Sequence, residues 1–346
     1  MLATTVALSS CSKIDDDRDD CEVDFQAQYR MCLVTNENLE IARVLGEHTA
    51  IGNDLREHLK DVFTDYGHDL GLGFYALPDS VRKQPLRGAL PTEMNATERS
   101  FEFFMPILDY MHLATSNVVS NGTVILRNDD RCHGASLIID PTLSDTIASQ
   151  QTGLFSGRRL LTDMTYGKQQ YDMNMYMVNC ADAIVLDPRT ALFTDVKVYT
   201  RGFAYSFSVC DSLFHYEKPT VTRSERVTLN DTNWLCFCSV NLPSREPSNS
   251  TRLRVETDQP FLYADCDEEI WYYDCYVTMA DGRPNGLNIK AGTITKTTLA
   301  IRHPLRAGQL KVILGWIDDR GVVHTDDQEV GVSIDLDWKP GIEFEW

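Results

Sequence analysis

The sequence predicts a mainly β protein made of two tandem β-sandwich domains, with a short helix inserted in the first domain. Most of the chain alternates apolar and polar residues with a period of two, which is the pattern of half-buried strands. Turn-forming residues separate these segments. The chain has 346 residues, 43% of them hydrophobic, and at about 150 residues per domain this is enough for two cores.

The first predicted strand is followed by the predicted helix. The strand alternates six apolar residues with mainly polar ones: Val23, Phe25, Ala27, Tyr29, Met31 and Leu33. The helix places five apolar residues on one face: Leu55, Leu59, Val62, Phe63 and Tyr66. Asn53 is the expected N-cap and Gly67 the expected stop. We expect this helix to pack on a sheet.

Further alternating segments predict the remaining strands. They cover residues 70–74, 101–105, 171–177, 203–209, 310–316, 330–336 and 342–346. Residues 318–321, Asp-Asp-Arg-Gly, predict a hairpin turn after the strand at 310–316. We place the first domain at 21–166 and the second at 167–346, with the boundary near Gly167 in the polar stretch "TDMTYGKQQ".

The charge of the chain argues against two classes of partner. The formal net charge is -19, which disfavours binding to the phosphates of DNA or RNA. It equally disfavours docking by charge on an anionic membrane surface. No segment of the sequence reaches the ~18 apolar residues that a membrane-spanning helix needs.

The first ten residues predict the late part of a lipoprotein signal peptide. They are apolar and small but lack a basic n-region, and we interpret Met1 as a late start rather than as a trimmed leader. Leu8, Ser9 and Ser10 precede Cys11 in the form of a bacterial lipobox. We therefore expect Cys11 to carry a lipid that holds the protein at a membrane.

Residues 11–20 are predicted to be a lipidated acidic tether. Ser12 and Lys13, followed by Asp15, Asp16 and Asp17, look like the acidic export signals of surface lipoproteins in the Bacteroidetes. The alternative is a solvated linker that carries no export signal. Both interpretations suit a segment that lacks hydrophobic periodicity.

Motifs that carry chemistry are absent from the sequence. It contains no glycine-rich phosphate loop, no H-E-x-x-H and no G-x-S-x-G. Cys132 and His133 are adjacent, and on a strand their side chains would point to opposite faces. The histidines are scattered. We therefore predict no catalytic, cofactor-binding or metal-binding residues, no small-molecule substrate and no enzyme activity.

The cysteines and aromatic residues suggest core positions. Cys236 and Cys238 share a face of a predicted strand, as small core residues do. Cys266 and Cys275 could close a hairpin by a disulfide if their Cα atoms lie close enough. The aromatic stretch 270–276 is either a platform for sugars or sandwich core, and its density favours core.

Several segments resemble the fimbrial anchor-subunit family of the Bacteroidales, the fimbrillin-A-associated anchor lipoproteins. They are "LSSC" with "DDRDDC", "TGLFSG" (152–157), "NCADAIVLDP" (179–188), "PLRAGQLKVI" (304–313) and "SIDLDWKPGIEFEW" (333–346). The resemblance spans nearly the whole chain, and "LDWKPG" is its most characteristic piece. The missing basic n-region departs from the family pattern.

The resemblance implies two transthyretin-like β-sandwich domains in a lipid-anchored subunit at the base of a surface fimbria. It implies attachment to the outer membrane. It also implies joining to stalk or other minor fimbrial subunits by β-strand complementation, in which a partner strand pairs with an open sheet edge. The short segment after "DWKPG" favours a terminal subunit. The alternative function is a surface lipoprotein that binds glycans through exposed Trp271 and Tyr273.

Overall fold

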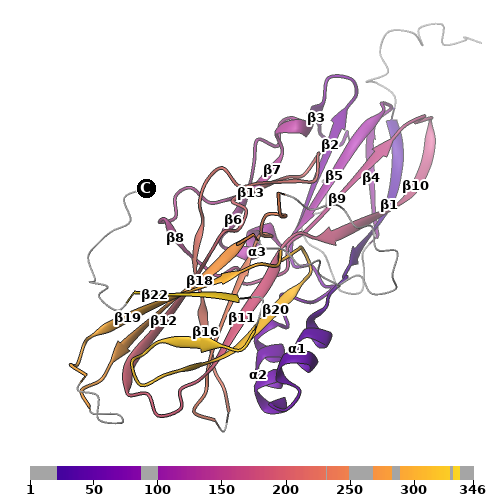
Figure 1. The fold of residues 1–346 in the computed structure, drawn as a ribbon. Coiled ribbons are helices and arrows are strands. Elements are labelled where there is room, and N and C mark those ends of the chain that lie inside the picture. The colour runs from indigo at the N-terminus through magenta and orange to yellow at the C-terminus, as the bar shows by residue number, and fades with distance from the viewer. Residues whose placement is uncertain are drawn as a thin grey trace, which may run out of the picture.

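The structure is a computed structural model that describes residues 22–86, 100–230, 232–248, 268–282, 289–327 and 330–335. It is mainly β, which confirms the predicted fold class, and Figure 1 shows its strands gathered in two regions. Among the described residues, no helix is long and apolar enough to cross a membrane.

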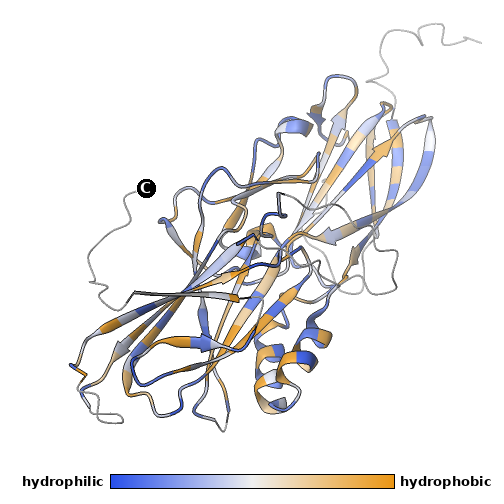
Figure 2. Cartoon of the chain, in the orientation of Figure 1, coloured by the Kyte–Doolittle hydropathy of each residue, from blue (hydrophilic) through white to orange (hydrophobic). Residues whose placement is uncertain are grey.

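The first region is a seven-stranded sheet that curls onto itself. Its strand order is β3-β2-β5-β9-β10-β1-β4. The bounds are β1 (Glu22–Cys32), β2 (Leu70–Ala76), β3 (Val81–Lys83), β4 (Ser100–Pro106), β5 (Tyr110–Ser116), β9 (Phe155–Leu161) and β10 (Gly167–Met177). Although β2 and β4 lie near opposite ends of this order, the ring centroids of Phe74 and Phe103 are 5.0 Å apart. The sheet therefore encloses an aromatic core, and Figure 2 shows the alternating hydropathy of its strands.

A four-stranded sheet covers the outer face of β2 and β5. Its order is β14-β13-β7-β6, with bounds β6 (Val124–Arg127), β7 (Ser136–Ile139), β13 (Ser206–Ser208) and β14 (Leu213–His215). Tyr75 and Leu113 of the curled sheet pack with Leu137 and Phe207 of this layer. The predicted strand at 203–209 is thus shorter than its alternation suggests. α3 (Val118–Asn121) and a 3-10 turn at Cys132–Gly134 lie in the loops before β6 and β7.

The second region is a sandwich of two sheets. The five-stranded sheet has the order β16-β17-β11-β20-β21, with bounds β11 (Cys180–Asp187), β16 (Glu225–Val227), β17 (Leu235–Asn241), β20 (Leu310–Ile317) and β21 (Val323–Thr325). The six-stranded sheet has the order β22-β19-β18-β12-β15-β8, with bounds β8 (Thr146–Ala148), β12 (Phe193–Arg201), β15 (Val221–Arg223), β18 (Trp271–Met279), β19 (Ile294–Ile301) and β22 (Val330–Asp335). Trp271, Tyr273 and Ile184 lie in the core between them.

The chain passes from the curled sheet to the second sandwich between β10 and β11. Gly167, where the sequence places the domain boundary, begins β10, and β10 pairs with β1 and β9 of the curled sheet. The second sandwich takes up the chain at Cys180. The hairpin turn at Asp318–Gly321 forms as predicted, with the Gly321 N–H donating to the Asp318 carbonyl at 2.9 Å.

Two helices, rather than one, follow β1. α1 spans Glu37–Leu45 and α2 spans Thr49–Leu59, so α2 begins before the predicted N-cap Asn53 and ends before Val62. Ile41, Leu45 and Leu55 pack against the outer face of the five-stranded sheet, in one cluster with residues such as Ala183 and Cys236. Figure 1 shows both helices beside β11, β16 and β20. A segment that lies early in the chain therefore covers the second sandwich.

Candidate subunit-joining edges

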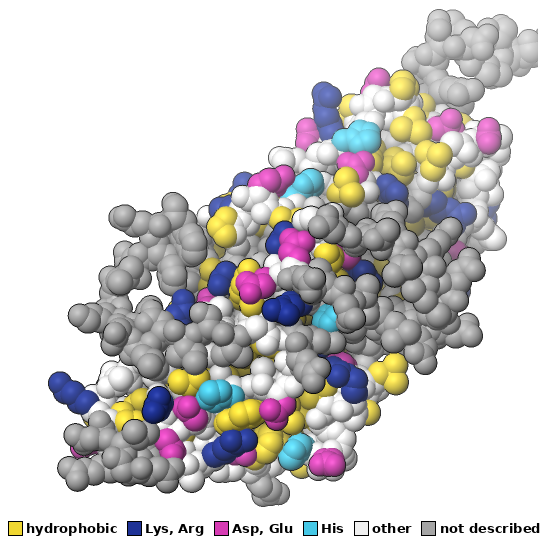
Figure 3. Space-filling view, viewed as in Figure 1, with side chains coloured by type: hydrophobic (Ala, Val, Ile, Leu, Met, Phe, Trp, Pro, Cys, Tyr) yellow, Lys and Arg dark blue, Asp and Glu magenta, His cyan; other side chains and the backbone are white. Residues whose placement is uncertain are grey.

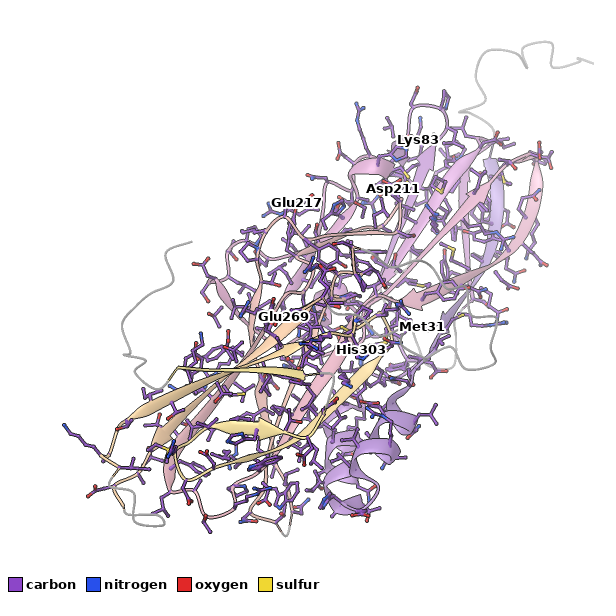
Figure 4. The ribbon with its side chains drawn as sticks, in the orientation of Figure 1. Met31, Lys83, Asp211, Glu217, Glu269 and His303 are labelled. Atoms are coloured by element: carbon purple, nitrogen blue, oxygen red, sulfur yellow. The ribbon has the colours of Figure 1, made fainter. Side chains whose placement is uncertain are left out.

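The predicted lipidation and export residues lie outside the described part of the chain. They are Leu8, Ser9, Ser10, Cys11, Ser12, Lys13, Asp15, Asp16 and Asp17. The described fold begins at Glu22, where β1 starts at the end of the curled sheet that is remote from the second sandwich (Figure 1). Met31, labelled in Figure 4, lies near the other end of β1, toward α1. The strand therefore runs from the outer end of the first region toward the second.

Charged side chains do not mark out a joining surface on the face shown in Figure 3. Where described side chains are visible there, acidic, basic and hydrophobic groups are interspersed over both regions. Sheet edges are the other feature that can take up a partner, because an unpaired edge presents N–H and C=O groups to an incoming strand. Two strands inside the sheets, β10 and β20, have such incomplete edges.

The first incomplete edge belongs to β10. On one side β10 pairs in parallel with β1 from the Val23↔Gly167 pair to the Cys32↔Tyr176 pair. On its other side it pairs with β9 at Tyr176↔Ser156 and Met177↔Phe155. Within the described residues, the backbone of 167–175 has no ladder partner on that side.

The seam between β9 and β10 is narrow. The Arg159 guanidinium donates a hydrogen bond to the Asp172 carbonyl and lies 5.6 Å from the centroid of the Tyr171 ring. A Cβ at Gly157 would lie 2.5 Å from the Asn174 carbonyl oxygen, so only glycine allows the two backbones to approach this closely. The inward side chains of Tyr171 and neighbouring methionines are buried in the aromatic core. A side chain, rather than a strand, bridges this part of the seam.

The second incomplete edge is the first half of β20. β11 pairs with β20 on one side from Leu310 to Trp316, whereas β21 covers the other side only from Gly315 to Ile317. The Asn36 side chain occupies the uncovered side beside Leu310. Its Nδ2 donates to the Leu310 carbonyl at 3.0 Å, and its Oδ1 accepts from the Leu310 N–H at 2.6 Å.

Glu40 of α1 continues this protection of β20. Its Oε1 accepts a hydrogen bond from the Val312 N–H at 3.0 Å. The Arg43 guanidinium holds the buried Glu40 carboxylate with hydrogen bonds of 3.0 and 2.9 Å. Asn36 and Glu40 thus make the backbone contacts that a further strand would make. Sequence reasoning missed both, because β20 is 274 residues from Asn36 and no local pattern links them.

Two buried titratable groups belong to the cores. Burial raises the pKa of Asp182 to about 7, against the opposing hydrogen bonds from Ser239 and Asn241. Burial lowers the pKa of His112 to about 4; its Nδ1 donates to the Gly73 carbonyl and its Nε2 accepts from the Tyr29 hydroxyl, both at 2.9 Å. Neither side chain is exposed. Their positions fit packing rather than contact with a substrate.

The aromatic stretch is core, as its density predicts. Trp271 and Tyr273 have 0% exposed surface, and the Trp271 indole N–H donates to the His303 carbonyl at 2.9 Å. The glycan-binding alternative required both rings at the surface, so it loses its main support. Cys236 and Cys238 are buried free thiols, as predicted. Cys275 is also a buried free thiol, while Cys266 lies outside the described residues.

Cys132 and His133 correct one expectation. They lie in the 3-10 turn at Cys132–Gly134, not on a strand, so their side chains do not diverge across a sheet. Both instead face Cys210: its Sγ is 2.6 Å from the Cys132 Sγ and 3.6 Å from the His133 Nδ1. Sequence reasoning did not find Cys210, which lies 78 residues beyond Cys132.

Comparison with known proteins finds solved structures that are similar to this chain. The chain is similar to a candidate adhesin from Bacteroides ovatus, with 12% identity, a TM-score of 0.47 and coverage of 85% of this chain and 87% of that one. It is similar to a candidate polysaccharide-binding protein from Bacteroides thetaiotaomicron, with 9% identity, a TM-score of 0.45 and coverage of 90% and 99%. It is also similar to the fimbrial anchor protein Mfa2 from Porphyromonas gingivalis, with 9% identity, a TM-score of 0.44 and coverage of 91% and 98%.

These structures include a fimbrial anchor protein, the class that the sequence resembles. No family model and no curated protein matches the chain. At these identities and TM-scores, the likeness carries no argument about function.

Proposed function

We propose that the chain is the anchor subunit of a surface fimbria. A lipid on Cys11 holds it at the outer membrane, and residues 12–20 form the tether between the lipid and β1. The next subunit, a stalk or other minor fimbrial subunit, joins it by β-strand complementation. The resemblance of "LSSC", "DDRDDC" and "LDWKPG" to the anchor family supports this proposal.

The incomplete edge of β10 is the observation that carries the joining step. Residues 167–175 present one edge without a described ladder partner, and the other face of the strand packs into the aromatic core. An incoming strand would pair with β10 at residues 167–173, beyond the close contact of Gly157 with the Asn174 carbonyl, and would set alternate side chains against that core. β1, which follows the tether, pairs with the opposite edge of β10, so the lipid and the partner would act on the same sheet.

Lipidation is tested by Cys11→Ala, made in the native cell with the complete leader. We expect the variant to leave the membrane fraction and to lose metabolic lipid labelling, whereas Ser12→Ala keeps both. Unchanged labelling of Cys11→Ala would rule out Cys11 as the anchor. Deletion of the protein should leave fimbriae shed or abnormal in length, and normal attached fimbriae would contradict the anchor function.

Joining at β10 is tested with a photo-cross-linking residue at Asn174, which is exposed on β10. We expect a covalent adduct with a neighbouring fimbrial subunit in intact cells. Val119, 84% exposed on α3 and part of neither β9 nor β10, is the control position. Equal adduct yields from both positions, or none from Asn174 in cells with assembled fimbriae, would contradict joining at this edge.

A further inference from the structure

Two thiols meet at one end of the four-stranded sheet. Cys132 lies in the 3-10 turn before β7, and Cys210 lies two residues after β13. Their Sγ atoms are 2.6 Å apart, and the residues are 2% and 3% exposed. This separation is closer to the ~2.05 Å of a disulfide bond than to the ~3.5–4.0 Å of an ordinary non-bonded contact.

The backbone around the two cysteines is fixed by neighbouring contacts. β13 pairs with β7 from Ser208↔Ser136 onward, and the Val209 N–H donates to the Ala135 carbonyl at 3.0 Å. Arg158 of β9 donates to the carbonyl of Cys210 itself. Asp211, labelled in Figure 4, follows Cys210 in this turn. The sulfur contact is therefore set by the pairing of the sheet rather than by one side-chain rotamer.

We propose that Cys132 and Cys210 form a disulfide that cross-links the two chain segments of the four-stranded sheet. In the chain, β6 and β7 come before β9 and β10 of the curled sheet, whereas β13 and β14 come after β11 and β12 of the second sandwich. The bond would join these segments across a loop of 78 residues and restrict the unfolded chain. This proposal rests on the proposed function in one respect: a surface protein lies in an oxidising compartment, where disulfides persist.

The oxidation transfers two electrons and two protons from the pair of thiols. One cysteine attacks the disulfide of a thiol oxidant, either a dithiol oxidoreductase or oxidised glutathione, and releases one reduced thiol. The second cysteine then resolves the mixed disulfide and releases the other thiol of the oxidant. Because burial raises the pKa of the Cys132 thiol, the thiolate forms with difficulty in the folded state, and the exchange takes place before the sheet closes.

Metal binding is the competing function for Cys210. His133, Cys210 and Asp211 place one ligand atom each within 4.8 Å of one another. A disulfide consumes the Cys210 sulfur as a ligand, so the two outcomes exclude each other. A structural zinc site takes four protein ligands; this group supplies three, and the Cys132 sulfur would have to supply the fourth, so zinc and the disulfide compete for both thiols.

Peptide mapping of the purified full chain tests the disulfide. The protein is refolded in a glutathione redox buffer, quenched with acid, alkylated and digested with trypsin without reduction. Cys132 then lies in the peptide 132–158 and Cys210 in the peptide 202–223, each with a single cysteine. We expect these two peptides to be linked, and the link to disappear on reduction.

Two variants complete the test. Cys210→Ser should abolish the linked peptide, while Cys180→Ser, a buried cysteine of the second sandwich, should leave it unchanged. Recovery of both wild-type peptides as separate alkylated species would overturn the proposal, as would one zinc ion per chain bound to the unlinked protein and lost in Cys210→Ser. The wild-type measurement needs no variant to fold, and it is independent of lipidation at Cys11.

Discussion

The incomplete edges of β10 and β20 are closed in different ways. At β20, Asn36 and Glu40 satisfy three backbone groups through well-formed hydrogen bonds, and α1 buries its apolar face beside them. At β10, the Arg159 guanidinium reaches one carbonyl, that of Asp172. Open edges invite pairing with other chains, and proteins protect those that must stay unpaired. The chain itself therefore protects the β20 edge, whereas β10 keeps the edge at which we propose that a partner strand pairs.

Removing the seal on β20 should have the largest effect. Asn36→Ala with Glu40→Ala leaves the N–H groups of Leu310 and Val312 and the Leu310 carbonyl without these partners. Each buried polar group that loses its hydrogen bond costs about 1–3 kcal/mol, so we expect the free energy of unfolding to fall by about 4 kcal/mol. Urea unfolding measures this loss, and hydrogen exchange should accelerate at Leu310 and Val312.

Leu39→Ala is the matched control for the seal, because Leu39 lies on α1 and is 66% exposed. It should change the free energy of unfolding by less than about 0.5 kcal/mol. If the double variant unfolds at the same urea concentration as this control, the side chains of α1 do not seal β20.

The two cores should respond to pH in opposite directions. In the unfolded chain Asp182 and His112 have ordinary pKa values of 3.8 and 6.5, whereas burial moves them to about 7 and about 4. The folded state binds more protons at Asp182, so its contribution to stability falls as pH rises from about 4 to about 7. The folded state binds fewer protons at His112, so its contribution falls as pH decreases from about 6.5 to about 4.

Single variants separate these two contributions. In Asp182→Asn, the free energy of unfolding should rise more steeply than in wild type as pH increases from 4 to 7. In His112→Gln it should rise less steeply. Each variant should differ from wild type by about 3 kcal/mol over this pH range. Chemical unfolding at a series of pH values measures the slopes. Parallel curves for wild type and Asp182→Asn would show that the carboxyl does not titrate in this range.

The position of Gly157 tests how tightly the β9–β10 seam is packed. Gly157→Val adds a side chain whose Cβ would lie 2.5 Å from the Asn174 carbonyl oxygen, so the two backbones must separate. We expect a loss of about 2 kcal/mol in urea unfolding, within the range for overpacking. Leu160→Ala, on the same strand and 54% exposed, is the control and should be nearly neutral. A neutral Gly157→Val would mean that the seam opens without cost.

Several strands of both regions could be predicted from sequence, because period-two alternation reflects burial of one face. β11 was not among them, since nearly all of its residues are buried and it lacks that alternation. Tyr171, Met173 and Met175 show this: they alternate in sequence and are buried in β10. The sheet to which β10 belongs could not be predicted, because its pairing with β1 joins residues 144 positions apart, as Val23 and Gly167 show. α1 escaped prediction since its nine residues give a short pattern and its packing partners lie on β20.

The candidate edges depend on similar long-range information. Arg159 and Asn36 are polar residues without a distinctive local motif, and each acquires its function from a backbone that the fold brings beside it. The predicted lipobox, by contrast, is a local pattern, because a peptidase reads contiguous residues. An open edge exists where no neighbouring strand pairs with the backbone. The alternation of residues along one strand does not show whether such a neighbour is present.

Arg159 offers the smallest change in stability and the sharpest test of the contrast between the edges. Arg159→Ala removes one hydrogen bond at an exposed side chain, so we expect the free energy of unfolding to fall by less than about 1 kcal/mol. The Asp172 carbonyl then becomes free for an incoming strand, and the yield of adducts from the photo-cross-linker at Asn174 should increase. Arg158→Ala is the matched control, because the neighbouring Arg158 instead donates to the Cys210 carbonyl in the turn between β13 and β14. If both variants change the adduct yield equally, Arg159 does not guard the β10 edge, and the partner strand must be sought at another edge of the molecule.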